Sequence, residues 1–338
     1  MHNQQLLLAP VCKDEKWGYI NQKGEMVIDC QFYEAEAFEN GLARVKCEKD
    51  GHWQSIDGYG HFVEMPPMNI PCPEGKILGE FRQGIAKVGY YKHEEYSSSE
   101  TVYDNAFDDV GHEEWSSSSA DWFIHGYMDE NGKMLTGYDY VSMGPQWDRD
   151  EISEGIVRIT DAKSHKVGYM DKTGRLLVKC EWDAMFNNFH DGLAQVWKMI
   201  LMFPKEGFIN TKGEMVIKKR WERAGDFHEG LAWIRAKGKY DVYNYINKNG
   251  TTVIGPRFWE RCGDFHEGLA WIQREELCGF IDKTGKNVIP CQWGWCKDFH
   301  EGLAAVRKEG CWDWGWIDKN GNVVIDCEWE GAGDFARV

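Results

Sequence analysis

The sequence predicts an all-β fold in which a small antiparallel unit is repeated eight times, and three observations support this prediction. A short motif of glycine and aromatic residues recurs along the 338 residues. Neighbouring segments alternate between apolar and polar residues with a period of two, which is typical of strands with two unlike faces. The chain also holds 37 glycines and 17 tryptophans but only nine prolines, a composition typical of short strands joined by tight turns.

The glycine-aromatic motif marks the centre of each unit and predicts a strand there. Its copies, some of them degenerate, lie near residues 18, 54, 126, 168, 207, 244, 279 and 315. The last four intervals between copies are 39, 37, 35 and 36 residues, a period typical of stacked or radially arranged repeats. We expect the central glycine to allow a neighbouring chain to approach closely.

Two further strands and a turn complete the unit. Residues 41–45 (Gly-Leu-Ala-Arg-Val), with their equivalents in other units, predict a strand before the motif, and residues 26–28 (Met-Val-Ile) begin one after it. Asp-Lys-Thr-Gly at 171–174 and 282–285 fits a type I turn, with Asp at the first position and Gly at the fourth. Each unit therefore has about three antiparallel strands, with a short fourth left open.

The chain ends bear on how the units are arranged. The sequence starts on a strand at residues 8–11 and stops at residues 334–338, where another unit would begin. A closed, propeller-like ring in one domain of residues 1–338 is favoured, because pairing of the two ends would remove both sheet edges. An open β-solenoid of stacked hairpin units is the alternative.

The third unit contains an insertion at residues 89–125. This segment carries nine acidic residues against the single basic Lys92, and it includes two runs of serine. Such a composition predicts an exposed, partly disordered hairpin extension.

The net charge, the lack of a recognisable targeting segment and the cysteine spacing limit which partners and which cellular compartment we expect. A formal charge of −16 argues against nucleic acid, which is bound by clustered lysine and arginine. We find no secretion signal and no apolar segment long enough to cross a bilayer, so no membrane partner is expected. The 11 cysteines follow no disulfide-like spacing, and the four that recur before an aromatic residue suit a small buried residue better than a metal ligand. We therefore expect a cytoplasmic protein without cofactor or metal.

Taken together, the Trp-Gly or Gly-aromatic core, the Asp-Lys-Thr-Gly turn and the Phe-x-Glu-Gly-Leu-Ala segment resemble the WG-repeat (KWG-repeat) family of bacterial β-repeat proteins. The resemblance covers nearly the whole chain. It implies an interaction module and supplies no catalytic residues. The departures are the 89–125 insertion, the degenerate second and sixth cores, and Gln54 in the place of a core glycine.

Two sets of side chains are candidates for a binding surface. A histidine followed by an acidic residue and glycine occurs at one position of four consecutive units: His190, His228, His266 and His300. These residues predict either backbone-bonded loops with exposed acids or a stripe that binds a partner and titrates near neutral pH. Trp233 and Trp271 replace a position that we expect to face solvent in the other units, and adjacent exposed tryptophans are typical of binding sites. Packing against a neighbouring strand is the alternative for them.

The resulting functional prediction is a non-enzymatic scaffold that binds a protein through this Trp/His stripe. A repeat protein that binds carbohydrate or another small ligand is the first alternative. An enzyme with a site at a ring centre or in the insertion is the second, although no nucleophile–base–acid motif is visible in the sequence.

Overall fold

The structure, a computed structural model, is built from strands. It describes residues 6–63, 70, 72–79, 81–102, 112–142, 152–183, 188–200, 203–218, 221–235 and 242–338. Within these residues strands are the only extended regular elements, and they form eight antiparallel sheets. The all-β class and the eight propeller-like repeats that the sequence predicts are thereby confirmed. The chain divides into two compact units, unit 1 (Met1–Pro67 and Ile217–Val338) and unit 2 (Met68–Val216).

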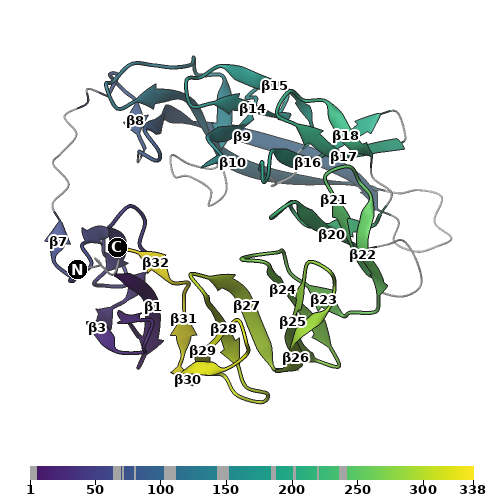
Figure 1. The fold of residues 1–338 in the computed structure, drawn as a ribbon. Helices are drawn as coiled ribbons and strands as arrows, with labels where there is room; N and C mark the ends of the chain where they lie inside the picture. Colours follow the sequence, from purple (N-terminus) through teal and green to yellow (C-terminus); the bar gives the residue numbers. More distant parts are fainter. Residues whose placement is uncertain are drawn as a thin grey trace. The chain divides into compact units, whose positions relative to one another are not determined.

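Unit 1 contains five of the sheets (Figure 1). The first consists of β1 (Leu7–Lys13), β2 (Lys16–Asn21), β3 (Met26–Phe32), β31 (Gly331–Ala332) and β32 (Ala336–Arg337). The second consists of β4 (Glu34–Ala35), β5 (Ala43–Lys46), β6 (Gln54–Ile56) and β7 (Phe62–Val63). The third consists of β19 (Arg223–Ala224), β20 (Leu231–Arg235), β21 (Tyr243–Asn247) and β22 (Thr252–Arg257). The fourth consists of β23 (Arg261–Cys262), β24 (Leu269–Arg274), β25 (Leu277–Asp282) and β26 (Asn287–Trp293). The fifth consists of β27 (Trp295–His300), β28 (Leu303–Arg307), β29 (Trp314–Asp318) and β30 (Val323–Trp329).

Unit 2 holds the remaining strands, except that the last of them, β18, runs to the start of unit 1. One sheet consists of β8 (Ile77–Leu78), β9 (Ile85–Val102), β10 (His112–Asp129) and β11 (Tyr140–Ser142). Another consists of β12 (Ile152–Ser153), β13 (Ile156–Thr160), β14 (Val167–Asp171) and β15 (Leu176–Trp182). The last consists of β16 (Leu193–Ile200), β17 (Phe203–Asn210) and β18 (Met215–Lys218).

Most repeats therefore have a short fourth strand, which precedes the three that the sequence predicts. In the first sheet this extra strand comes from the other end of the chain, because β1 pairs with β31 and β32. Val11 lies opposite Ala332 and Leu8 opposite Ala336. Both chain ends thus lie in one sheet of unit 1 (Figure 1), and this pairing removes the sheet edge that each end would otherwise expose.

The core glycine fulfils its predicted role. A Cβ at Gly279 would lie 2.5 Å from the carbonyl oxygen of Ile289, because β26 bulges toward β25 at this point. Gly18 and Gly315 have the same close approach from β3 and β30. In the third sheet of unit 1 the glycine lies on the other strand of the pair. Asn244 holds the core position in β21, and Gly255 in β22 leaves space for the Asn244 side chain.

Apolar faces are buried between adjacent repeats. One cluster joins Tyr245 and Ile254 of one sheet to Ala270, Ile272 and Ile281 of the next. The phenylalanine that precedes each His-Glu-Gly segment is buried, and it packs on an aromatic ring of the preceding sheet in two cases: Phe265 contacts Tyr245, and Phe299 contacts Phe280. A single repeat could not bury this surface alone, so neighbouring repeats stabilise one another.

The 89–125 segment contains most of a long hairpin. Strands β9 and β10 pair over 18 residue pairs, from Ile85 opposite Asp129 to Val102 opposite His112. Residues 103–111, the predicted tip of this insertion, lie outside the described residues.

Candidate functional site

The predicted histidines lie at tight turns between the first two strands of a repeat. His266 and Leu269 exchange backbone hydrogen bonds of 2.9 and 3.1 Å across Glu267 and Gly268. Both central residues have positive φ, 52° for Glu267 and 86° for Gly268, as a type I′ hairpin turn requires. The same turn recurs at Glu229-Gly230 and Glu301-Gly302. Asn40-Gly41 in the second repeat is the sequence signal for this type I′ turn, which the His-acid-Gly pattern of the other repeats does not show as clearly.

Three of the four histidines form one continuous row. The ring centroids of His228 and His266 lie 4.7 Å apart, and those of His266 and His300 lie 5.2 Å apart. Each imidazole also faces an aspartate of the following repeat. The Nε2–Oδ2 distances are 4.0 Å for His228–Asp264, 3.8 Å for His266–Asp298 and 3.7 Å for His300–Asp334. We call these six residues the Asp–His ladder.

The environment of the ladder disfavours charged carboxylates. Burial, together with the negative charges of Asp226 and Asp298, raises the pKa of Asp264 to about 8. Burial also raises the pKa of Asp298, partly offset by His266 and His300. The Oδ1 atoms of Asp264 and Asp298 are buried and have no hydrogen-bond partner among the described residues. The side chains remain 27% and 31% exposed, so their other oxygen atoms can be reached from solvent.

The glutamates beside the histidines join adjacent repeats, a role that the sequence pattern does not reveal and that we call the latch. The Glu267 carboxylate accepts a hydrogen bond from the Gly302 amide and pairs with the Lys319 ammonium at 3.0 Å. Glu229 makes the same contacts with Gly268 and Lys283. Burial alone would raise the pKa of Glu229, but the Lys283 ammonium and the Gly268 amide outweigh it and leave the pKa below its usual value. The ladder histidines are therefore carried on turns that the next repeat fixes.

His190 belongs to unit 2, whereas the six residues of the ladder belong to unit 1. Its turn is the same as the others, with His190 and Leu193 exchanging backbone hydrogen bonds. The Gly192 amide donates to the Glu154 carboxylate, which repeats the latch. Buried Asn188 stands two residues before His190, where the ladder repeats have aspartate. The structure therefore brings three of the four predicted histidines together in unit 1.

Trp233 and Trp271 are half-buried rather than exposed. Their indole rings lie against Gly225 and Gly263, where an added Cβ would approach the indole Nε1 atom to 2.2 and 2.1 Å. Each tryptophan packs on the core of its own repeat and supports the segment that leads to Asp226 or Asp264. The expectation that this strand position faces solvent is wrong elsewhere, because these inner strands are covered on both faces. The buried residues at the equivalent position are Lys87, Arg158, Gln195 and Ala305.

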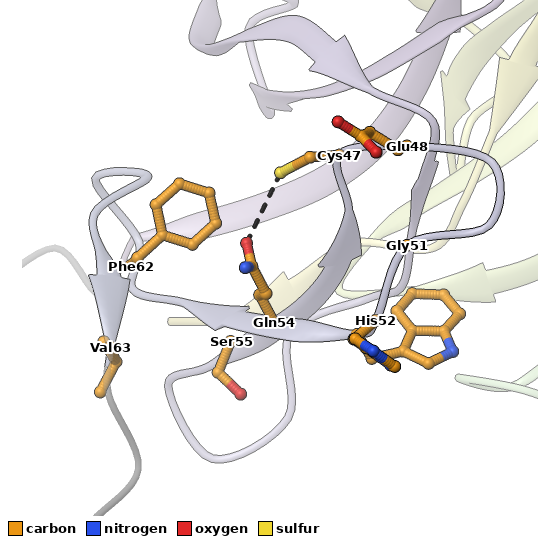
Figure 2. A pocket seen from close by; sticks show the side chains of 9 residues that line it. Cys47, Glu48, Gly51, His52, Gln54, Ser55, Phe62 and Val63 are labelled. Carbon is orange, nitrogen blue, oxygen red and sulfur yellow. Dashed lines mark hydrogen bonds between the residues drawn. The ribbon is translucent and has the colours of Figure 1, made fainter.

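A separate cavity of about 680 Å³ opens in the second repeat, beside β6 (Figure 2). The Cys47 thiol donates a 3.6 Å hydrogen bond to the Gln54 side chain, and Phe62 lies across from this pair. Lys46 lies 4.8 Å from the centre of the Trp53 ring, and it pairs with Glu34 at 2.9 Å. The cavity lies in the repeat whose last strand, β7, has only two residues.

Metal and membrane sites were also sought. Among the described residues, no group of three or more histidine, cysteine, aspartate or glutamate side chains is placed to hold a metal ion. In the same part of the chain, no helix is long and apolar enough to cross a membrane.

Comparisons with known proteins agree with this geometry. The family profile described as "WG containing repeat" matches residues 17–53, 168–196, 207–240, 245–278, 279–312 and 314–337. No curated protein matches the sequence.

Comparison with solved structures gives matches at low sequence identity. The crystal structure of a eukaryotic initiation factor has a TM-score of 0.50 and 11% identity, over 98% of both chains. A nidogen/laminin complex gives a TM-score of 0.28 and 8% identity over 84% of this chain and 91% of that one. The tricorn protease gives 0.24 and 10% over 96% of this chain and 35% of that one. At such low identity the first of these likenesses concerns the fold alone.

Proposed function

The chain belongs to the WG-repeat family, and on this premise we propose that it is a non-enzymatic scaffold that binds a protein partner through the Asp–His ladder. The observation that carries the proposal is the continuity of the ladder. His228, His266 and His300 come from three consecutive repeats and contact one another in a row. Their side chains are 24%, 24% and 38% exposed.

The rigidity of the surface favours binding. Each histidine precedes a two-residue turn. Glu229 and Glu267 in these turns are fixed by an amide and a cation of the next repeat, and Glu301 pairs with Arg337 at 3.0 Å. Trp271 enters the proposal as a support of the segment that leads to the ladder residue Asp264, and Trp233 supports the equivalent segment before Asp226. A surface that is already ordered loses little conformational entropy when a partner binds.

The chemistry of the ladder favours a partner segment with lysine or arginine side chains. The side chains of Asp264 and Asp298 are 27% and 31% exposed, and a cation placed beside them would favour their charged forms, which burial disfavours in the free chain. The chain as a whole carries −16, which would accelerate encounter with a basic partner and repel an acidic one. We place this interaction in the cytoplasm, and the eleven free thiols support a reducing compartment.

Affinity purification from the native host tests the proposal. We expect the double variant His266→Gln/Asp298→Asn to lose a partner that the wild-type chain captures, because both residues lie in the middle of the ladder. The matched control is His61→Gln/Asp57→Asn, an exposed His–Asp pair of 3.2 Å in the same unit. Loss in the ladder variant alone supports the proposal. Equal capture by the wild type and the ladder variant would contradict it.

A further inference from the structure

A second site lies in the last complete repeat, between two exposed tryptophans. Trp295 is 47% exposed at the start of β27, and Trp312 is 82% exposed in the loop between β28 and β29. The two rings border a cavity of about 230 Å³, which Arg307 and Lys308 also line. This volume suits one six-membered ring and a small substituent.

Comparison with the other repeats of unit 1 shows what is missing from this cavity. After the buried tryptophan of a third-strand segment, three repeats have a glutamate: Glu222, Glu260 and Glu330. The amides of these residues bond to carbonyl groups at the end of the neighbouring strand, those of Arg235, Gln273 and Cys12. The repeat of β27–β30 has Gly294 at this place, and its amide bonds to the Arg307 carbonyl at 2.9 Å. The positions are therefore equivalent.

The glutamates of the other repeats satisfy local donors. The Glu222 carboxylate pairs with Arg235 at 2.8 Å, and Arg235 is the equivalent of Arg307. Glu260 and Glu330 accept backbone amides of the adjacent turn, those of Glu276 and Glu15. A carboxylate thus occupies this place in three of the five sheets of unit 1, and the second repeat has Tyr33 there, whose amide bonds to the Lys46 carbonyl.

Arg307 has no such carboxylate. Its guanidinium carbon lies 4.1 Å from the Trp314 ring centre and 6.0 Å from that of Trp312. Its Nε atom is buried without a hydrogen-bond partner among the described residues, as is that of Arg235, but Arg307 lacks the ion pair to a carboxylate that Arg235 makes with Glu222. The acidic residues nearest in sequence, Glu309 and Asp313, are exposed. Arg307 is therefore a partly buried cation that is held by aromatic rings and has donors to spare.

We propose that this cavity binds a carboxylate carried on a ring, with the carboxylate at Arg307 in the place of the absent glutamate. The ring lies between Trp295 and Trp312, because indole faces stack well on flat or weakly polar rings. Aromatic acids and sugar acids share this chemistry. The site is independent of the Asp–His ladder and gives the small-ligand alternative a specific location.

Calorimetric titration of the full chain tests the proposal with four probes. Phenylacetate and glucuronate present the two kinds of ring acid, and phenylacetamide and glucose are their uncharged counterparts. We expect one of the acids to bind and its uncharged counterpart to bind on the order of tenfold more weakly or worse, since a hydrogen bond to a charged group is lost. Absence of binding by both acids, or equal binding of acid and counterpart, would overturn the proposal.

Three variants locate the binding. Gly294→Glu restores the internal carboxylate and should abolish binding without removing any residue that contacts the ligand. A side chain there approaches the Lys308 carbonyl at 3.0 Å, so Arg307→Gln and exposed Trp312→Ala give tests that do not depend on this fit. Both should weaken binding, Arg307→Gln about tenfold or more. Arg235→Gln, in the repeat where Glu222 is present, is the matched control and should bind like the wild type.

Protection of a cysteine thiol from alkylation shows where the acid binds. Cys311 lines the cavity, and Cys47 lines the other one; both are exposed free thiols. The bound acid should slow alkylation of Cys311 and leave that of Cys47 unchanged. Binding that persists in Gly294→Glu, or equal protection of both thiols, would place the ligand elsewhere and contradict the proposal.

Discussion

The second repeat and the fourth sheet of unit 1 share one backbone plan but differ in what they carry. Both have a buried phenylalanine before a type I′ turn, Phe38 in one and Phe265 in the other. The flanking positions differ: Ala37 and Glu39 stand where the β23–β26 repeat has Asp264 and His266. The second repeat also has Gln54 in place of Gly279. The comparison separates residues that both repeats need for their fold from residues that differ between the repeats.

The largest loss of stability is expected from removing the buried phenylalanine that the two repeats share. Phe265→Ala should lower the free energy of unfolding by about 3–5 kcal/mol, because it removes a fully buried ring that contacts Tyr245 at 4.9 Å between centroids. Phe38→Ala should cost nearly as much, since Phe38 contacts Tyr19 at 5.0 Å. Denaturant unfolding followed by circular dichroism measures both. A large loss in only one repeat would show that the second repeat does not share the packing plan.

A smaller loss of stability is expected at the core position, which is Gly279 in one repeat and Gln54 in the other. Gly279→Ala introduces a Cβ 2.5 Å from the Ile289 carbonyl oxygen, so strands β25 and β26 must separate. We expect a loss of roughly 1–3 kcal/mol, typical of overpacking. Gln54→Gly is the reverse change in the second repeat and should cost about 1 kcal/mol or less, the usual penalty of glycine in a strand. The same unfolding measurement checks both, and an Ala at 279 without cost would refute the close-approach role.

Local patterns predicted most of the repeat, because its strands and turns depend on neighbouring residues. In the Asp282–Gly285 turn, the Gly285 amide bonds to the Asp282 carbonyl at 2.9 Å, as the sequence indicates. The core glycine was also correctly interpreted, because a glycine that recurs inside a strand pattern indicates a close backbone approach.

Contacts between repeats were harder to predict. The histidine stripe was visible in the sequence, but its aspartates were not recognised, although Asp264 and His266 are two residues apart and so share a face of an extended chain. The latch role of Glu267 depends on Gly302 and Lys319 of the next repeat, a contact that no local pattern contains. The absence of glutamate at Gly294 becomes informative only after the strand register aligns the repeats. The solvent exposure expected for Trp233 and Trp271 failed because an alternating pattern does not reveal that both faces of an inner strand are covered.

The last comparison concerns the pH dependence of stability, which has opposite signs for two aspartates of these repeats. Burial first, then the charges of Asp226 and Asp298, raise the pKa of Asp264 to about 8 in the folded chain. The folded state therefore binds this proton more tightly than the unfolded state, and stability falls as pH rises from about 4 to about 8. Hydrogen bonds from the His61 amide and the Tyr59 amide instead lower the pKa of Asp57. The contribution of Asp57 to stability is therefore present above the unfolded pKa and is lost as pH falls.

We expect Asp264→Asn to flatten the decline of thermal stability toward pH 8 and Asp57→Asn to leave that decline intact. Unfolding temperatures across pH 5 to 9 measure the difference. A wild-type decline that survives unchanged in Asp264→Asn would show that the ladder carboxylate titrates as it does in the unfolded chain, and that burial in the β23–β26 repeat does not distinguish it from Asp57.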